Sequence, residues 1–471
     1  MRSQTAPPRS ATVTRPPGWT RSDAVVLCVE AALLAAAVVV GAMLNARGVR
    51  LHADAAPLFA TWRPHVGWGT PLALLLVAAV VLGPGPRWAR TARWSVLLAA
   101  GWLASVAWTL ALALVDGWSA GLTRRLTVQA EYLFEVPRVT DVPRMLAGFT
   151  DRILDFQPES WSTHTAGHPP GALLVFVWLD RVGLGGGAAA ALACVLVGAT
   201  VAVSVPLTLR ALGAADSGRA VLPFLVLLPG AVWVGASADG IFAGVVAAGL
   251  ALLALRGPAT ALAGGLLLGF ALHLSYGFIL VAPLALVVLA LRPTRRRAAL
   301  LGAAAGVGAV VAAFTITGFR WWEGYDRVVE RYHQGWAADR PYGYWVWANL
   351  AALLLSAGPV LGPALRRTLL VARAGWWSDR AGPAPVGAGW ALAERARRLG
   401  PVVLLPSTAA LAVTAADLSG MSKAEVERIW LPFVVWLLVA TAHLPGPSRR
   451  WWLAGQAVTA LAVNHLLLTV S

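Results

Sequence analysis

Carboxylates and a histidine stand at the edges of long apolar segments, where acid–base chemistry could take place. Asp116 ends an apolar run in the sequence ALALVDGW and begins a long polar stretch. A carboxylate at the edge of hydrocarbon is costly unless it has a partner or a task, so Asp116 could act as a general base or as a ligand. A helix end that simply reaches water explains the same pattern equally well.

His168 begins the sequence His-Pro-Pro-Gly, which leads directly into an apolar run. The two prolines preset the first turn of a helix, and the free N–H groups of that turn could face an anion. His168 could therefore bind a phosphate or donate a proton. A plain joint between a loop and a helix, with a solvated histidine, has the same sequence.

Two further segments place charged side chains beside apolar runs. Asp239 lies in GASADGIFAG, where helix capping accounts for it as well as a binding role does. Glu425 and Arg428 are three residues apart, so they share a helix face. They could pair with each other or bind a polar substrate.

An aromatic segment, residues 319–344, carries Arg320, His333 and Arg340 among several Trp and Tyr residues. Aromatic faces stack on sugar rings, and guanidinium groups hold phosphates by forked hydrogen bonds. The same composition is typical of an aromatic belt at the membrane surface. Both interpretations remain open for each of the three residues.

The composition determines which elements can position these side chains. Of 471 residues, 58% are hydrophobic and only 13% are charged, and the mean hydropathy is +0.68. A soluble domain of this length would need far more polar surface, so lipid must be the solvent for most of the chain. The net charge of +16 comes from short Arg clusters between apolar runs and not from the basic groove of a nucleic-acid-binding protein.

We therefore predict an all-α fold, a polytopic transmembrane helix bundle of about 13 spans, each needing about 20 apolar residues. A disordered tail, residues 1–23, precedes a single transmembrane domain, residues 24–471, whose outer loops 117–168 and 319–344 contain short interfacial helices. The predicted spans are 24–45, 67–84, 94–115, 187–209, 219–236, 239–255, 259–273, 276–291, 299–318, 345–363, 400–416, 430–445 and 451–470.

The Arg clusters predict the orientation of these spans. They lie in the N-terminal tail and in the segments 85–93, 292–297, 364–399 and 446–450. Placing all of them in the cytoplasm puts the N-terminus inside and the loop 117–168 outside. The apolar run 169–184 is then a short helix that does not cross, unless one weak loop breaks the charge rule. The excess of Ala, Gly, Arg and Trp is typical of a GC-rich bacterial genome, so we expect a multi-pass protein of the bacterial plasma membrane.

The order of these features resembles the GT-C superfamily of membrane glycosyltransferases, such as the protein O-mannosyltransferases and the aminoarabinose and arabinosyl transferases. In that superfamily an acidic residue opens the first large outer loop, as Asp116 does here. The same loop closes with an HPP or KPP segment, similar to residues 167–174. A second acidic residue at a later outer turn is similar to Asp239, and an aromatic outer loop is similar to residues 319–344.

The resemblance implies a polyprenyl-phosphate sugar as donor and a glycan, lipid or protein as acceptor, with no nucleic acid involved. Asp116 would deprotonate or bind the acceptor hydroxyl, and the reaction would invert the sugar. Glu131 and Asp141 are substitutes for this base, because Gly117 follows Asp116 where the superfamily has a second acid. Arginines and His168 would hold the leaving phosphate. A divalent metal, Mg²⁺ or Mn²⁺, is compatible with this chemistry but is not required by the sequence.

Two other function classes fit the same composition. A transporter or flippase for a lipid or polar solute needs ionisable residues and broken helices within the membrane, and Glu30 is one such residue. A non-catalytic scaffold of a cell-envelope complex needs neither a base nor a donor site.

Overall fold

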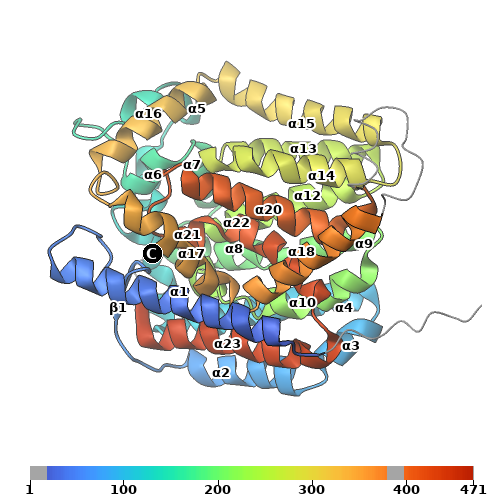
Figure 1. The fold of residues 1–471 in the computed structure, drawn as a ribbon. Helices are drawn as coiled ribbons and strands as arrows, with labels where there is room; N and C mark the ends of the chain where they lie inside the picture. Colours follow the sequence, from blue (N-terminus) through green and yellow to red (C-terminus); the bar gives the residue numbers. More distant parts are fainter. Residues whose placement is uncertain (1–17, 379–396, 470–471) are drawn as a thin grey trace, which may run out of the picture.

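A computed structural model describes residues 18–378 and 397–469. Its helices run side by side in a bundle, and loops and short helices gather at the two ends (Figure 1). The first part comprises α1 (Arg21–Ala46), α2 (Gly69–Val77) with the π-helical turn η1 (Ala78–Leu82), α3 (Gly85–Thr91) and α4 (Trp94–Ala113). Most of the predicted tail lies outside the described residues, and α1 begins slightly before the predicted residue 24.

The long polar segment after α4 folds into short helices, as predicted for the loop 117–168. These are η2 (Ser119–Thr123), η3 (Arg125–Thr127), η4 (Tyr132–Phe134), η5 (Val136–Arg138), α5 (Val142–Ala147), η6 (Thr150–Arg152) and α6 (Thr163–Gly167). The apolar run 169–184 follows as α7 (Gly171–Arg181), which has 11 residues. At 1.5 Å per residue α7 is about 16 Å long, roughly half the thickness of the hydrocarbon core.

The middle of the chain supplies the centre of the bundle. Its elements are α8 (Gly187–Gly198), α9 (Val201–Ala211), α10 (Ala215–Val226), α11 (Ala231–Val234), α12 (Asp239–Ala254), α13 (Pro258–Leu272), η7 (Tyr276–Val281), α14 (Ala282–Leu291) and α15 (Arg296–Ile316). The last part comprises α16 (Trp321–Gln334), α17 (Tyr342–Ala357), α18 (Leu361–Ser378), α20 (Pro401–Leu418), α21 (Val426–Ile429), α22 (Leu431–Leu437), η9 (Leu438–His443), η10 (Gly446–Ser448) and α23 (Arg449–Leu466).

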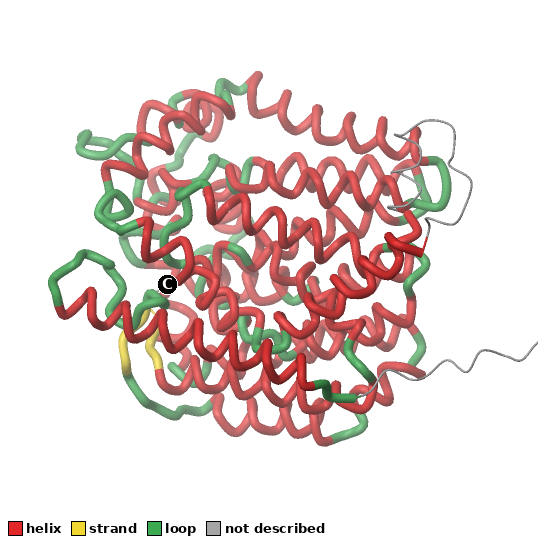
Figure 2. The backbone as a smooth tube through the Cα atoms, in the orientation of Figure 1, coloured by secondary structure: helices red, strands yellow, loops and turns green. Residues whose placement is uncertain are grey.

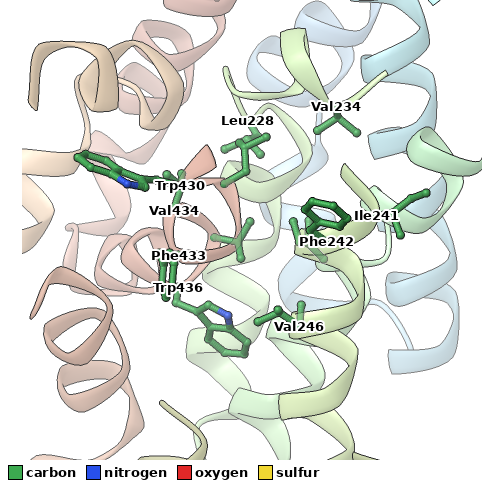
Figure 3. Close-up of a cluster of buried hydrophobic side chains, with 14 of the residues drawn as sticks. Leu228, Val234, Ile241, Phe242, Val246, Trp430, Phe433, Val434 and Trp436 are labelled. Atoms are coloured by element: carbon green, nitrogen blue, oxygen red, sulfur yellow. The ribbon is translucent and has the colours of Figure 1, made fainter. Parts of the chain in front are cut away.

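Buried apolar side chains of α12 and α22 form the centre of the core. Figure 3 shows Val246 of α12 beside Trp436 of α22, with Phe242 one turn nearer the start of α12. All three side chains are almost completely buried. Because α12 and α22 each begin at a polar segment, their packing brings the segments before Asp239 and Leu431 together at one end.

Lipid must cover much of the outer surface. Five helices of the described residues are long and apolar enough to cross a membrane, or seven if each strongly bent pair counts as one span. Only 11% of the apolar window of α1 and 22% of that of α15 is buried in protein. Helices occupy most of each predicted span, but several are short, so the structure does not confirm the count of about 13 crossings.

The Arg clusters meet at one end of the bundle, which we call the basic end. Arg367 and Arg366 bind Asp23 at the start of α1, at 2.5 and 3.3 Å. Arg450 donates to the carbonyl of Val81 in the segment before α3. In Figure 1, α3, the start of α15 and the start of α1 lie at the right, opposite α5, α6 and α16. The structure therefore separates a basic end from an end rich in short helices, which we call the loop end.

A small antiparallel ladder is added to a fold that is otherwise helical, as the all-α prediction expected. The strand β1 (Ala60–Trp62) pairs with β2 (Leu467–Thr469), so that Thr61 lies opposite Leu468 (yellow in Figure 2). Three-residue strands carry no strong alternation, and their partners are about 400 residues apart in the chain. The ladder joins the segment between α1 and α2 to the C-terminal segment at the loop end.

Candidate functional site

Asp116 and Asp239 both lie at the loop end. Asp116 lies three residues after the last residue of α4. The first turn of α4 lies near Arg219, which binds the carbonyls of Ala89 and Ala92 at the basic end. Asp239 begins α12, whose last turn accepts a hydrogen bond from Arg292 through the carbonyl of Leu253. α4 therefore runs from the basic end to the loop end, and α12 runs from the loop end to the basic end. Asp116 and Asp239 thus both lie at the loop end.

A buried network, which we call the Arg428 cluster, joins three polar segments. Its members are Glu131, His164, Asp239, Glu425 and Arg428. Arg428 Nη1 donates to Asp239 Oδ2 at 2.8 Å, and Nη2 donates to Glu425 Oε2 and lies 3.0 Å from His164 Nε2. His164 Nδ1 lies 3.0 Å from Glu131 Oε1. The cluster therefore links the loop 117–168, the turn before α12 and the segment containing α21.

The charges in the Arg428 cluster depend strongly on one another. The side chains of Arg428 and Asp239 are each only 6% exposed. Burial alone would raise the pKa of Glu425, but Arg428 and Arg340 outweigh it and hold this pKa at about 2. Burial would also lower the pKa of Arg428, whereas Glu425 and Asp239 raise it. Loss of Arg428 would leave the buried carboxylate of Asp239 without a cation and Glu425 with Arg340 alone, which is destabilising.

The contact with Arg428 fixes the form of His164. A guanidinium only donates, so His164 Nε2 must accept and Nδ1 must carry the proton that faces Glu131. Burial disfavours the charged ring, but Glu131 outweighs burial and raises the pKa of His164. A second proton would place an N–H of His164 against Arg428, so acidification would loosen this link of the cluster.

His168 lies next to the cluster, and its Nε2 can accept a hydrogen bond but cannot donate one. Its Nδ1 donates to the carbonyl of His164 at 2.8 Å, and its ring lies between Tyr132 and Phe242. Burial lowers the pKa of His168 to about 4, so the ring is neutral and Nε2 keeps its lone pair. This state suits a bond from a substrate hydroxyl better than a bond to a phosphate oxygen.

Asp116 belongs to a second group, which we call the Asp116 cluster, together with His65 and Arg125. Asp116 Oδ1 lies 2.7 Å from His65 Nε2, and Oδ2 accepts from Arg125 Nη2 at 3.1 Å. Arg125 also donates to the carbonyls of Ala120 and Thr469. The side chain of Asp116 is 13% exposed. The cluster thus combines the end of α4, the segment after β1 and the C-terminal strand.

The two clusters arise from segments that touch. A methyl group placed on Gly235, four residues before Asp239, would lie 3.2 Å from Leu122 and 3.8 Å from the Ala113 Cβ. Ala113 is the last residue of α4 and lies three residues before Asp116. The segments that carry the two clusters therefore touch each other near the end of α4.

Other sequence-predicted residues lie apart from both clusters or support them indirectly. Arg340 bonds Glu425 at 3.4 Å, so it extends the Arg428 cluster. Arg320 pairs with Glu323 in a mostly exposed ion pair, and His333 bonds the carbonyl of Val329 in its own helix. Asp141 caps α5 by accepting from the N–H of Arg144.

The sequence is compatible with a divalent metal ion but does not require one. Within the part of the chain that the structure describes, no group of three or more His, Cys, Asp or Glu side chains could hold a metal ion. Asp239 and Glu425 are instead both engaged by Arg428. These residues do not fit a Mg²⁺ or Mn²⁺ site of the usual oxygen-rich kind, and we assign no step to a metal.

Residues with weak or no signals in the sequence complete both clusters. His164 stands four residues before His168 in the same polar segment, so a search for paired histidines at helical spacing would have found it. His65 and Arg125 carry no local signal, because their partner lies in another segment. Glu427 is completely buried in α21, and neither of its oxygens has a hydrogen-bond partner among the described residues.

Ser119 lies in a Gly-Trp-Ser-Ala-Gly sequence, residues 117–121, which matches the GxSxG pattern of serine hydrolases. That nucleophile requires a turn from a strand into a helix, whereas Ser119 begins the π-helical turn η2 after a helix. Both ring nitrogens of the nearby His65 are already engaged, by Arg63 O and by Asp116. The geometry therefore does not support a serine nucleophile.

Comparisons with known proteins give little further information. No protein-family model matches the chain, and no curated protein matches it. One solved structure is similar, the crystal structure of ArnT from Cupriavidus metallidurans in the apo state, with 15% sequence identity and a TM-score of 0.42. The match covers 73% of this chain and 59% of that chain, so this chain spans well under two thirds of the matched protein.

Proposed function

We propose that the chain is an integral membrane glycosyltransferase of the GT-C type. It moves a sugar from a polyprenyl-phosphate donor to a glycan, lipid or protein acceptor at the loop end, on the outer face of a bacterial plasma membrane. The observation that carries this proposal is the Arg428 cluster, which gathers buried acids and a buried guanidinium from three segments beside the His-Pro-Pro joint. The separate basic end supports the orientation, because Arg-rich loops stay in the cytoplasm.

The Arg428 cluster is suited to hold the donor. Arg428 Nε is buried and has no partner among the described residues, so one N–H remains for a phosphate oxygen. A fixed guanidinium stabilises the negative charge that develops on the phosphate as the sugar leaves. His168 Nε2 is available to accept a bond from a sugar hydroxyl. Asp239 and Glu425 hold Arg428 in place and keep it charged.

The Asp116 cluster is suited to the acceptor. A carboxylate at the end of α4, held by Arg125 and His65, could bind an acceptor hydroxyl or take its proton. The hydroxyl oxygen then attacks the anomeric carbon from the side opposite the phosphate. This attack inverts the sugar and releases the polyprenyl phosphate.

The first test concerns the donor. We expect Arg428→Lys to lower transfer from a labelled polyprenyl-phosphate sugar by about 100-fold, because lysine cannot reproduce a fixed guanidinium. Purified protein in lipid is assayed with mannosyl, arabinosyl and aminoarabinosyl donors. Arg327→Lys is the matched control, since Arg327 lies in neither cluster and pairs with Glu330 at an exposed position. Unchanged transfer by a folded Arg428→Lys protein would remove the cluster from the mechanism.

The second test concerns the acceptor. Asp116→Asn keeps the shape of the side chain but removes its charge, and we expect transfer to fall by about 100-fold or more. Asp151→Asn, at an exposed position of the same loop, serves as the control. If Asp116→Asn retains activity, Glu131→Gln and Asp141→Asn decide between the two substitute bases. Retained activity in all three variants would exclude a base from these positions.

One observation favours a transporter or flippase as the second candidate. Glu30 of α1 accepts a bond from the N–H of Gly362 at 2.7 Å, and its other oxygen is buried without a partner among the described residues. Gly362 lies just after the 97° bend between α17 and α18. A carboxylate beside a broken helix is typical of transport sites. Solute or lipid movement in proteoliposomes that Glu30→Gln abolishes and Asp116→Asn does not change would favour this function.

A further inference from the structure

We infer that an exposed group of side chains at the loop end binds a sugar ring of the acceptor, and hence that the acceptor is a glycan. This group, which we call the Trp336 platform, comprises Arg50 and His52 of the segment after α1 and Trp336 and Asp339 of the segment before α17. The inference rests on the proposed glycosyl transfer, because it chooses a glycan over a lipid or a protein as the acceptor of that reaction.

Trp336 offers an open aromatic face. Its ring stacks on the ring of His52, with the two centroids 5.1 Å apart and an angle of 10° between the planes. His52 covers only one face, and 63% of Trp336 remains exposed, so the other face is open. The C–H side of a sugar ring is a flat apolar surface that packs on such a face. Because His52 already holds the indole, little side-chain freedom is lost when a ring binds.

A polar pair lies at the edge of this stack. Arg50 Nη1 donates to Asp339 Oδ2 at 3.2 Å, and His52 Nε2 lies 3.5 Å from the same oxygen. The side chains of Arg50 and Asp339 are 73% and 42% exposed, so their remaining N–H groups and lone pairs can reach a ligand. An aromatic face beside a donor and an acceptor matches a sugar ring, which carries hydroxyls around its rim. Lipid tails would leave both charges without water, so this tryptophan does not face hydrocarbon.

Arg340 joins the Trp336 platform to the Arg428 cluster. A single nitrogen, Arg340 Nη2, donates to the carbonyl of His52 at 3.3 Å and to Glu425 Oε1 at 3.4 Å. The side chain of Arg340 is only 7% exposed, so this link is buried beneath the exposed pair. The platform therefore lies directly beside the residues that we propose hold the donor.

The position of the platform indicates which sugar it binds. A ring stacked on Trp336 stays at the surface, whereas the transferred sugar must reach the buried Arg428 cluster, so the ring bound here belongs to the acceptor. The segment between α1 and α2 supplies His52 to the platform and His65 to the Asp116 cluster. A glycan of several sugars can therefore present its reacting hydroxyl to Asp116 while a sugar further along its chain stacks on Trp336.

Binding without a donor tests the platform directly. Purified protein in lipid is titrated with tetrasaccharides of mannose, arabinose and galactose, and binding is followed by the NMR signals of the sugars. We expect one of them to bind and Trp336→Ala to weaken its binding by about 10-fold, through loss of the stacked ring. Trp322→Ala is the matched control, because Trp322 of α16 is similarly exposed, at 54%. Absence of binding by all three sugars, or equal binding by a folded Trp336→Ala protein, would overturn the inference.

Turnover distinguishes an acceptor subsite from a part of the chemistry. With the tetrasaccharide that binds as acceptor, Trp336→Ala should raise KM by about 10-fold and change kcat by less than about twofold, since the lost contact is made before and during the reaction alike. With the corresponding monosaccharide, which is too short to occupy both places, Trp336→Ala and the wild-type protein should have the same kcat/KM. An equal loss with both acceptors would overturn the inference.

The two readouts separate the possible failures. If a glycan binds through Trp336 but the wild-type protein transfers sugar from none of the donors, the proposed function fails, and the platform remains a carbohydrate-binding site without an acceptor role. If transfer occurs to a lipid or a protein and is the same in Trp336→Ala, the proposed function stands and only the inference about the acceptor fails.

Discussion

Several ionisable side chains at the loop end are buried, and the carboxyl group of Glu427 has the fewest stabilising contacts among them. Glu427 lies in α21, between Glu425 and Arg428 in the sequence. Its side chain is completely buried, and neither of its oxygens has a hydrogen-bond partner among the described residues. Burial, assisted by Glu425, raises its pKa from 4.5 to about 7. Below about pH 7 Glu427 is therefore neutral while Glu425 is ionised, because their pKa values are shifted in opposite directions.

The raised pKa of Glu427 predicts how stability depends on pH. Between about pH 4.5 and 7 the folded protein keeps a proton that the unfolded chain has lost, so the free energy of unfolding falls as pH rises through this window. A shift from 4.5 to about 7 corresponds to about 3 kcal/mol. We expect Glu427→Gln to remove most of this slope in thermal unfolding at fixed lipid composition. Glu330→Gln, at an exposed position, should keep it; a slope unchanged in Glu427→Gln would contradict the assignment.

Helices were the part of the fold that sequence could predict. Each long apolar run forms a helix because backbone polar groups in lipid must bond within the same segment. The breaks were harder to predict. The bend between α17 and α18 occurs at Gly358, whose φ of +90° is open mainly to glycine, but many glycines in this chain lie inside straight helices. Only packing against neighbours shows which glycine ends a helix and which permits close contact.

The close contact of α13 with α15 gives a prediction at the scale of elements. A methyl group on Gly306 would lie 2.4 Å from the Leu262 carbonyl oxygen and 2.6 Å from the Leu266 nitrogen, whereas one on Gly308 meets nothing within 4 Å. We expect Gly306→Ala to force the helices apart and to lower the free energy of unfolding by about 1–3 kcal/mol. Gly308→Ala, two residues away, should have no such cost. Equal thermal stability of the two variants would show that the helices are not packed this closely.

At the scale of the whole molecule, the apolar pattern brings Asp239, Glu425 and Arg428 together, but it does not predict the residues that complete the two clusters. Asp239, Glu425 and Arg428 converge because the apolar runs that follow them pack side by side, and the pattern of apolar runs is visible in the sequence. His65 and His164 meet their partners across 51 and 264 residues, with no periodicity to indicate the pairing. Short strands such as β1 and β2 form only because the folded bundle brings their segments together, so the local sequence does not predict them.

The separation of the basic end from the loop end predicts the orientation in the membrane. We replace the exposed Cys28 by Ser and leave Cys194, which is buried. A single cysteine is then introduced at Glu159, exposed at the loop end, or at Thr294, exposed at the basic end. Because Arg-rich loops stay in the cytoplasm, a membrane-impermeant maleimide added to intact cells should label Glu159→Cys at once. It should label Thr294→Cys only after the membrane is opened. The reverse pattern would place both clusters in the cytoplasm, where an acceptor of the outer envelope could not reach them.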